Sequence, residues 1–168
     1  HACMGITSPA GKTLVTDPWI ANEPVYSESE WRIPWLDDDT VSNIVEIADY
    51  LYISHSHEDH FHLQSLDLFS RDLTVIIPRF CWSSSSRKML MKNTLVDMGF
   101  RNIIELSAWE NHALEPTMSV QMIPCAKSRA HDWENSGLII RTSNSVVLNL
   151  NDNIPDSNLV DDIGHALG

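Results

Sequence analysis

The sequence predicts one α/β domain whose functional side chains lie at the ends of strands. Residues 48–54 and 73–78 are compact apolar runs, which is typical of strands buried on both faces of a sheet. Residues 84–98 place apolar side chains on one helical face, and Gly99 follows as a helix stop. Beyond residue 102 the pattern changes to short strands. With 168 residues and 43% hydrophobic content, the chain can bury one sizeable core.

The N-terminal part is expected to hold one strand and one packed loop. Residues 12–17 form a β-branched run that stops at Pro18, which predicts a strand carrying Asp17 at its end. Residues 18–40 are too irregular for a helix or strand and too apolar for a solvated linker, so we expect a packed loop that covers a pocket. The acidic run at 37–39 is interpreted as a solvated loop. The indoles expected to line the pocket are Trp19, Trp31 and Trp35.

A short helix and four strands are expected in the remaining segments. The helix is predicted at residues 64–69, before the second apolar run. The strands are predicted at 102–106, 118–123, 137–142 and 145–150, and the last two are joined in a hairpin at Ser143-Asn144. The side chains expected to pack the last strand are Val146, Leu148 and Leu150.

The composition argues against a nucleic-acid-binding protein and against a membrane protein. The formal net charge is −12, from 11 basic and 23 acidic side chains, and such a surface repels a phosphate backbone. No apolar run is long enough to span a bilayer, and the first residues lack the pattern of a signal peptide. The three cysteines are odd in number and far apart, so we expect no disulfide framework and a cytoplasmic protein.

A cluster of metal-binding side chains follows the first apolar run. The segment His55-Ser56-His57-Glu58-Asp59-His60 places three imidazoles and a carboxylate within six residues. Residues two apart in an extended segment project to the same side, so His55 and His57 can hold one ion. The following turn brings Asp59 and His60 towards a second ion. A histidine-rich surface loop is the alternative, and this spacing disfavours it.

A metal site with open positions needs further ligands from elsewhere in the chain. His131 lies in a polar turn between two predicted strands, whereas His112 lies in what looks like a simple reversal, so His131 is preferred. Asp152 follows a buried-strand pattern and is expected at a strand end, with a structural Asx-turn as the alternative. The other histidines are interpreted as structural, and His62 is the nearest candidate for a supporting role. They are His1, His62, His112 and His165.

The order of these motifs resembles the metallo-β-lactamase superfamily. The resemblance rests on Thr16-Asp17-Pro18-Trp19, on Ile53-Ser54 with the histidine cluster, on His131 and on Asp152. The tryptophan-rich stretch, residues 98–103 and residues 149–152 are also similar to the metallo-β-lactamase domain of CMP-N-acetylneuraminate hydroxylases and related bacterial proteins. The resemblance implies a metallo-β-lactamase-like αββα sandwich, of which this chain would contain the N-terminal half to two-thirds.

The resemblance also implies a role for each matched residue. His55, His57 and His131 would hold the first metal ion, Asp59 and His60 the second, and Asp152 would bridge both. Asp17 would support the ligand loop without contacting a metal ion. The family has a further C-terminal histidine, and His165 is too close to Asp152 to take its place. We therefore expect residues 1–168 to be a domain truncated at both ends, completed by a missing C-terminal half or another subunit.

Two metal ions in such a site predict an enzyme that acts on a small molecule. Zinc is the first expectation, with iron or manganese as alternatives. Such ions lower the pKa of bound water from about 15.7 towards about 7, and Asp59 can orient or deprotonate that water. The predicted reaction is hydrolysis of an ester, amide, lactone or phosphodiester. Two alternatives stay open: a component of an iron-dependent hydroxylase, whose Rieske cluster the cysteines of this chain cannot ligate, and a non-catalytic metal-stabilised module.

Overall fold

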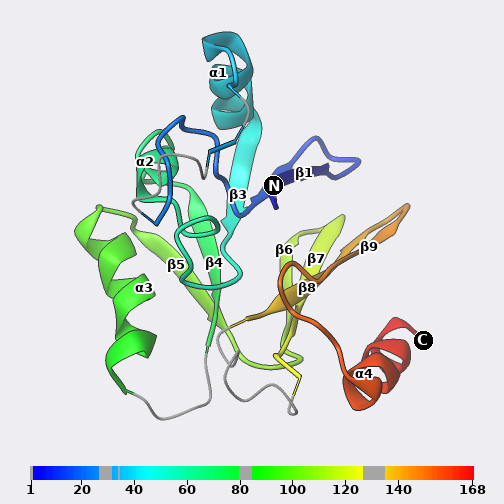
Figure 1. The fold of residues 1–168 in the computed structure, drawn as a ribbon. Helices are drawn as coiled ribbons and strands as arrows, with labels where there is room; N and C mark the ends of the chain where they lie inside the picture. Colours follow the sequence, from blue (N-terminus) through cyan, green and yellow to red (C-terminus); the bar gives the residue numbers. More distant parts are fainter. Residues whose placement is uncertain (1, 27–31, 34, 80–84, 127–134) are drawn as a thin grey trace.

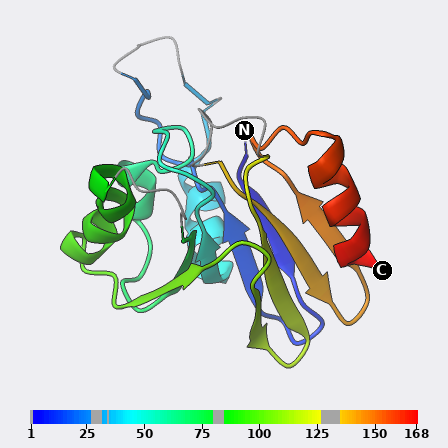
Figure 2. The same cartoon turned by 90° about the horizontal axis from the view of Figure 1, so that it is seen from below.

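Two β-sheets form the middle of the structure, and helices lie on both outer sides. The computed structural model describes residues 2–26, 32–33, 35–79, 85–126 and 135–168, with the backbone alone for residues 85–90. Helices α3 (Ser85–Asp97) and α4 (Ser157–Leu167) lie on opposite sides of the molecule with the strands between them (Figure 2). The layers are therefore helix, sheet, sheet and helix, as in the predicted αββα sandwich.

The strands divide between the sheets in chain order (Figure 1). The first sheet contains, in spatial order, β1 (Met4–Thr7), β2 (Thr13–Thr16), β3 (Ala48–Tyr52), β4 (Thr74–Pro78) and β5 (Asn102–Leu106). The second contains β6 (Asn111–Glu115), β7 (Met118–Ile123), β8 (Gly137–Thr142) and β9 (Val146–Asn149). The other two helices of the described part are α1 (Asp38–Ile47) and α2 (Leu63–Leu66). None of the helices described is long and apolar enough to cross a bilayer.

The first sheet is parallel from β2 to β5, which brings the carboxyl ends of these strands to one edge. Successive side chains face opposite layers: Leu51 of β3 packs beneath the helices, whereas Tyr52 faces the second sheet. Burial on both faces explains why β3 and β4 read as continuous apolar runs, and the strands predicted at 48–54 and 73–78 are confirmed. The same edge carries the residues that follow β2 and β3.

The second sheet is an antiparallel meander, and the predicted hairpin between β8 and β9 is confirmed. Leu138 and Ile140 face the first sheet and fill the core between the two sheets. Ile139 points outward and packs against Leu159 and Ile163 of α4. Alternation along β8 therefore supplies side chains to two separate apolar clusters.

Gly137, at the start of β8, allows a close approach between two backbones. A Cβ atom at this position would lie 2.7 Å from the carbonyl oxygen of Asn149 and 3.2 Å from Cα of Leu150. Both atoms belong to backbone, so they cannot move aside cheaply. A glycine is therefore required where the chain leaves β9 towards Asp152.

The acidic run at 37–39 begins a helix, which corrects the interpretation of a solvated loop. Asp37 is the N-cap of α1 and accepts a hydrogen bond from the backbone N–H of Thr40 at 2.8 Å. Two further aspartates lie in the first turn, where the positive end of the helix dipole stabilises negative charge. Val41 and Ile44 of α1 are half-buried against the core beneath the first sheet.

Three further elements differ from the prediction. No element or only a loose turn was expected at three places. They hold strand β1, strand β6 with His112, and helix α4 with His165. The prediction that Val146 and Leu148 pack β9 is wrong, because both are exposed and Val147 faces the core between the sheets instead. Leu150 does pack, against the cluster beneath α4.

Candidate metal centre

Asp17 connects the ends of β2 and β3. It follows β2 directly, is fully buried and has a φ angle of 37°, in the left-handed region. Its Oδ1 accepts the backbone N–H of Ser54 at 2.7 Å, and its Oδ2 accepts the Ser54 hydroxyl at 2.7 Å and His60 Nδ1 at 2.9 Å. Burial raises the pKa of Asp17, and these three donors oppose that rise. One carboxylate therefore fixes the start of the histidine cluster and one of its rings.

Hydrogen bonds at Nδ1 set the tautomers of His55 and His60. The Ser54 hydroxyl proton is donated to Asp17, so Ser54 Oγ accepts the proton on His55 Nδ1, at 2.9 Å. His60 donates its Nδ1 proton to Asp17. In their neutral forms both rings therefore present an unprotonated Nε2, which is the form that binds a metal ion.

The pKa shifts of the two rings differ because their surroundings differ. Burial lowers the pKa of His55 to about 3, and the neighbouring His60 and His57 rings add to that effect. Burial also acts to lower the pKa of His60, but the carboxylates of Asp17, Asp152 and Asp59 outweigh it and raise the pKa. His55 is therefore the ring that is neutral over the widest range of pH.

The carboxylate of Asp152 lies between the two histidines. Its Oδ2 is 3.8 Å from His55 Nε2, and its Oδ1 is 3.5 Å from His60 Nε2. His57 approaches from the other side, with its Nδ1 2.9 Å from His55 Nε2. The described residues that could share one ion are His55, His60 and Asp152, whose ligand atoms lie within 4.8 Å of one another. The two sheets therefore bring together residues that are 97 positions apart (152 − 55).

These separations fit a metal site. Two ligand atoms at 2.0–2.1 Å from a tetrahedral ion lie about 3.3 Å apart. The 2.9, 3.5 and 3.8 Å distances lie around this value, and the two oxygens of Asp152 each face a different histidine. Asp152 is therefore within reach of both rings, and its predicted bridging role stays a prediction. The donor set of imidazoles and carboxylates suits zinc, iron or manganese.

Asp59 contributes a further carboxylate beside His60. Its Oδ2 lies 3.7 Å from His60 Nε2, and its Oδ1 accepts a hydrogen bond from the Tyr26 hydroxyl at 2.5 Å. Burial and the hydrogen bond to Asp59 raise the pKa of Tyr26, so the phenol keeps the proton it donates. Sequence reasoning missed Tyr26 because a single tyrosine in an irregular loop carries no spacing signal.

Two polar residues before β8 hold the site from the second sheet, and no sequence pattern marks them. Ser136 is buried; its Oγ donates to the carbonyl oxygen of Ser54 at 2.6 Å and contacts the Tyr52 hydroxyl at 2.7 Å. Asn135 donates from Nδ2 to the carbonyl oxygen of Asp152 at 3.2 Å. The segment before β8 thus ties the end of β3 to the loop that carries Asp152.

The other predicted residues have varied positions. His131 lies outside the described residues, so its predicted role stays a prediction. His112 is half-buried on β6 and is not among the described residues that could share an ion. His62 Nδ1 contacts Ser65 Oγ at 2.8 Å, and that oxygen accepts the backbone N–H groups of Ile20 and Ala21. His62 therefore helps to anchor the loop after β2.

The two described indoles of the tryptophan loop differ in exposure. Trp19 is buried beside His62, with ring centroids 5.8 Å apart. Trp35 is 71% exposed, and Trp31 lies outside the described residues. The expectation that the three indoles line one pocket therefore stays a prediction.

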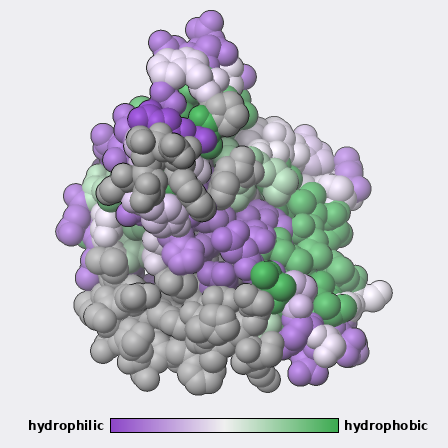
Figure 3. Space-filling model, in the orientation of Figure 1, coloured by the Kyte–Doolittle hydropathy of each residue, from purple (hydrophilic) through white to green (hydrophobic). Residues whose placement is uncertain are grey.

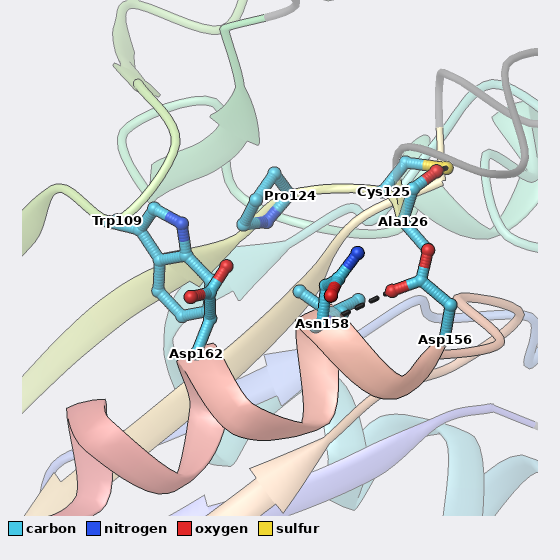
Figure 4. A pocket seen from close by; sticks show the side chains of 8 residues that line it. Trp109, Pro124, Cys125, Ala126, Asp156, Asn158 and Asp162 are labelled. Atoms are coloured by element: carbon cyan, nitrogen blue, oxygen red, sulfur yellow. Dashed lines mark hydrogen bonds between the residues drawn. The ribbon is translucent and has the colours of Figure 1, made fainter.

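The surface near the cluster is polar, and a small cavity lies elsewhere. On the face drawn in Figure 1, hydrophilic side chains gather in the middle and hydrophobic ones lie on the side of the second sheet (Figure 3). A cavity of about 100 Å³ opens between α4 and the end of β7 (Figure 4). Its lining residues are Trp109, Pro124, Cys125, Ala126, Asp156, Asn158, Leu159 and Asp162. None of them is a predicted metal ligand.

The family of the chain follows from a match over most of its length. A family model described as the beta-lactamase superfamily domain matches residues 1–147. The chain belongs to this family. The match includes the histidine cluster and the segment of His131, and it ends before Asp152.

This β-lactamase superfamily domain is similar in sequence to parts of longer proteins. A candidate Rieske 2Fe-2S iron-sulfur protein of Mycolicibacterium smegmatis is 29% identical over 162 residues, covering 92% of this chain and 29% of the relative. Cytidine monophosphate-N-acetylneuraminic acid hydroxylase of Danio rerio is 25% identical over 116 residues, covering 66% of this chain and 18% of the relative. The chain thus spans less than a third of the length of these relatives.

Solved structures of metal-dependent enzymes share the fold of this domain. A candidate metal-dependent hydrolase from Veillonella parvula has a TM-score of 0.73 and 13% identity, covering 98% of this chain and 64% of the other. CmlA, a diiron β-hydroxylase from Streptomyces venezuelae, has a TM-score of 0.71 and 22% identity, covering 100% of this chain and 31% of the other. At these identities the likeness concerns the fold alone.

Proposed function

We propose that this domain binds two divalent metal ions and that they form the reaction centre of an enzyme. The observation that carries the proposal is the position of the Asp152 carboxylate, with one oxygen towards His55 Nε2 and the other towards His60 Nε2. While both rings are neutral, a carboxylate without metal gains little by lying between their two unprotonated nitrogens. Two cations would stabilise that arrangement.

The ligands of the proposed pair come from three segments of the chain. His55, His57 and the predicted His131 would hold one ion, Asp59 and His60 would hold the other, and Asp152 would serve both. Asp17 keeps the proton of His60 on Nδ1 and Ser54 keeps that of His55 on Nδ1, so both Nε2 atoms stay available as ligands. Asp59 is the group on the chain that can accept a proton from a water molecule at the site.

The relatives in sequence favour oxygen-dependent hydroxylation over hydrolysis. Those named above are a candidate iron-sulfur protein and a hydroxylase, and they match this chain at 29% and 25% identity. When bound, iron would supply redox chemistry for hydroxylation, whereas zinc would supply a Lewis acid for hydrolysis. The cysteines of this chain lack the pairs that ligate a Rieske cluster. An iron–sulfur domain elsewhere in a longer protein, or a separate protein, would then deliver the electrons.

Hydrolysis of an ester, amide, lactone or phosphodiester in a small molecule is the second candidate function. The ligand set favours it, because imidazoles and carboxylates of this kind suit zinc as well as iron. The sequence alone placed this reaction first. We place it second here because a hydroxylase is among the relatives in sequence, whereas the structural likeness to hydrolases concerns the fold alone.

Metal analysis of the full-length protein, purified without chelator, tests the proposal. We expect two ions per chain in this domain, with iron supporting hydroxylation and zinc supporting hydrolysis. Iron in any iron–sulfur cluster is counted separately through acid-labile sulfide. Oxygen consumption and turnover of generic esters and phosphodiesters then distinguish the two reactions. One or two ions per chain with neither activity would overturn the proposal in favour of a non-catalytic metal-stabilised module, and fewer than one ion per chain would overturn metal binding itself.

A further inference from the structure

Tyr26 contacts the histidine cluster through two separate hydrogen bonds. Its hydroxyl donates to Asp59 Oδ1 at 2.5 Å, across 33 positions in the sequence. Its backbone N–H donates to Glu58 Oε2, also at 2.5 Å. The two bonds end on adjacent residues, so together they fix both the position of the Tyr26 backbone and the direction of its ring.

The backbone of Tyr26 is held in a conformation that a tyrosine rarely adopts. Its φ angle is 57°, in the left-handed region that favours glycine. A bulky residue keeps such a conformation where surrounding contacts over-determine it, and strain of this kind gathers at functional sites. Here the contacts that hold the conformation come from Glu58 and Asp59, at the centre of the predicted ligand set.

The two carboxylate oxygens of Asp59 have different contacts. Oδ1 accepts the phenol, while Oδ2 lies on the side of His60, 3.7 Å from its Nε2. We propose that Tyr26 is a positioning residue of the second metal site, which presents Asp59 to the ion through Oδ2 alone. This inference rests on the proposed two-metal function. In it, the carboxylate of Glu58 holds the backbone of Tyr26 in place.

The other two tyrosines show that this contact is not a general feature of tyrosines in the chain. The Tyr50 hydroxyl donates to the backbone carbonyl of Leu114 at 3.0 Å, and the Tyr52 hydroxyl contacts Ser136. Neither acceptor is a predicted metal ligand. Tyr50→Phe removes one hydroxyl hydrogen bond without touching the cluster, so it is the matched control for Tyr26→Phe.

The test is a Co²⁺ titration of the chelator-stripped full-length protein, followed by visible absorption. Wild type is expected to bind two ions. In Tyr26→Phe we expect the affinity of the second ion to fall by about tenfold or more, which is typical for loss of a group that orients a ligand. The first ion should bind as in wild type, and the absorption band of the second should change, because Asp59 can then rotate. Glu58→Ala should produce a smaller loss at the same site.

The possible results separate the inference from the function on which it rests. Tyr26 is 39% exposed, so Tyr26→Phe is expected to fold, and thermal denaturation beside Tyr50→Phe checks this. Two ions in wild type, with the same affinities and spectrum in Tyr26→Phe, would overturn the positioning role alone. Equal losses in Tyr26→Phe and Tyr50→Phe would also overturn it. Failure of wild type to bind Co²⁺ would overturn the two-metal function and this inference together.

Discussion

At the scale of single residues, buried polar side chains decide how the predicted ligands are presented. Asp17 accepts three hydrogen bonds at the junction of β2 and β3, and one of them fixes the proton of His60. The resemblance to the family implied a supporting role for Asp17, and its contacts agree with that role. Tyr26 supports Asp59 in a comparable way from the loop after β2.

Asp152 and His57 should differ in how much metal their loss removes. We expect Asp152→Ala to lose the second ion and most turnover, because the shared carboxylate is removed. His57→Ala should lose the first ion as well, since a site with open positions cannot spare one of three protein ligands. Metal content per chain, measured in the full-length protein, distinguishes the two variants.

Asp152→Ala should leave the fold largely intact. Its side chain is 50% exposed, and the bond from Asn135 goes to its backbone carbonyl, which the substitution retains. Far-ultraviolet circular dichroism checks the fold. If Asp152→Ala kept both ions and its activity, the assignment of Asp152 as the bridging ligand would be wrong.

At the scale of elements, the loop after β9 depends on a close approach to β8. The segment before β8 supplies Asn135 to the Asp152 backbone and Ser136 to the end of β3. Gly137 follows directly, and its missing side chain leaves room for Asn149 and Leu150. A strand whose Val146 and Leu148 side chains are exposed can therefore still position the loop that carries Asp152.

Gly137→Ala is expected to destabilise the protein by about 1–3 kcal/mol, because the added methyl group meets backbone atoms. The affinity for metal should fall with it, since the loop bearing Asp152 is displaced. Gly164→Ala is the matched control, because a Cβ there meets nothing within 4 Å. In the interior of α4 that change should stabilise by about 0.5–1 kcal/mol. Urea denaturation measures the free energy of unfolding of both variants. An equal change in the two variants would contradict the prediction.

At the scale of the whole molecule, the site lies where the two sheets meet. Histidines at the end of the parallel sheet face an aspartate delivered by the antiparallel sheet. The link behind them runs from the Tyr52 hydroxyl through Ser136 Oγ to the Ser54 carbonyl. Because Ser136 donates to Ser54, Tyr52 is the donor to Ser136, and burial raises the pKa of Tyr52 so that it keeps its proton.

Tyr52→Phe should weaken this connection between the sheets. Loss of one buried hydrogen bond is expected to lower the free energy of unfolding by about 1 kcal/mol. Metal affinity should also fall, because Ser54 adjoins His55. Tyr50→Phe should reduce stability to a comparable degree or less and leave metal binding unchanged, as its hydroxyl bonds Leu114 away from the site. Unaltered metal affinity in Tyr52→Phe would show that the link serves stability alone.

The sequence by itself determined the strands at 48–54 and 73–78, the hairpin at residues 143 and 144, and the six-residue histidine cluster. Each is a local pattern: burial on both faces gives a continuous apolar run, and metal ligands in one loop must lie close together in sequence. The family assignment follows from the order of such patterns. The acidic run that begins α1 carries no decisive local signal, because the same three aspartates suit a solvated loop and a helix start equally well.

The tertiary structure alone decided which distant side chains complete the site. Tyr26, Asn135 and Ser136 are common polar residues in irregular segments, and their partners are set by how the two sheets pack. The exposure of Val146 and Leu148 was decided in the same way, because the position of α4 over the second sheet determines which outward side chains it covers. Contacts between residues far apart in the chain depend on packing, and no spacing rule within one segment contains that information.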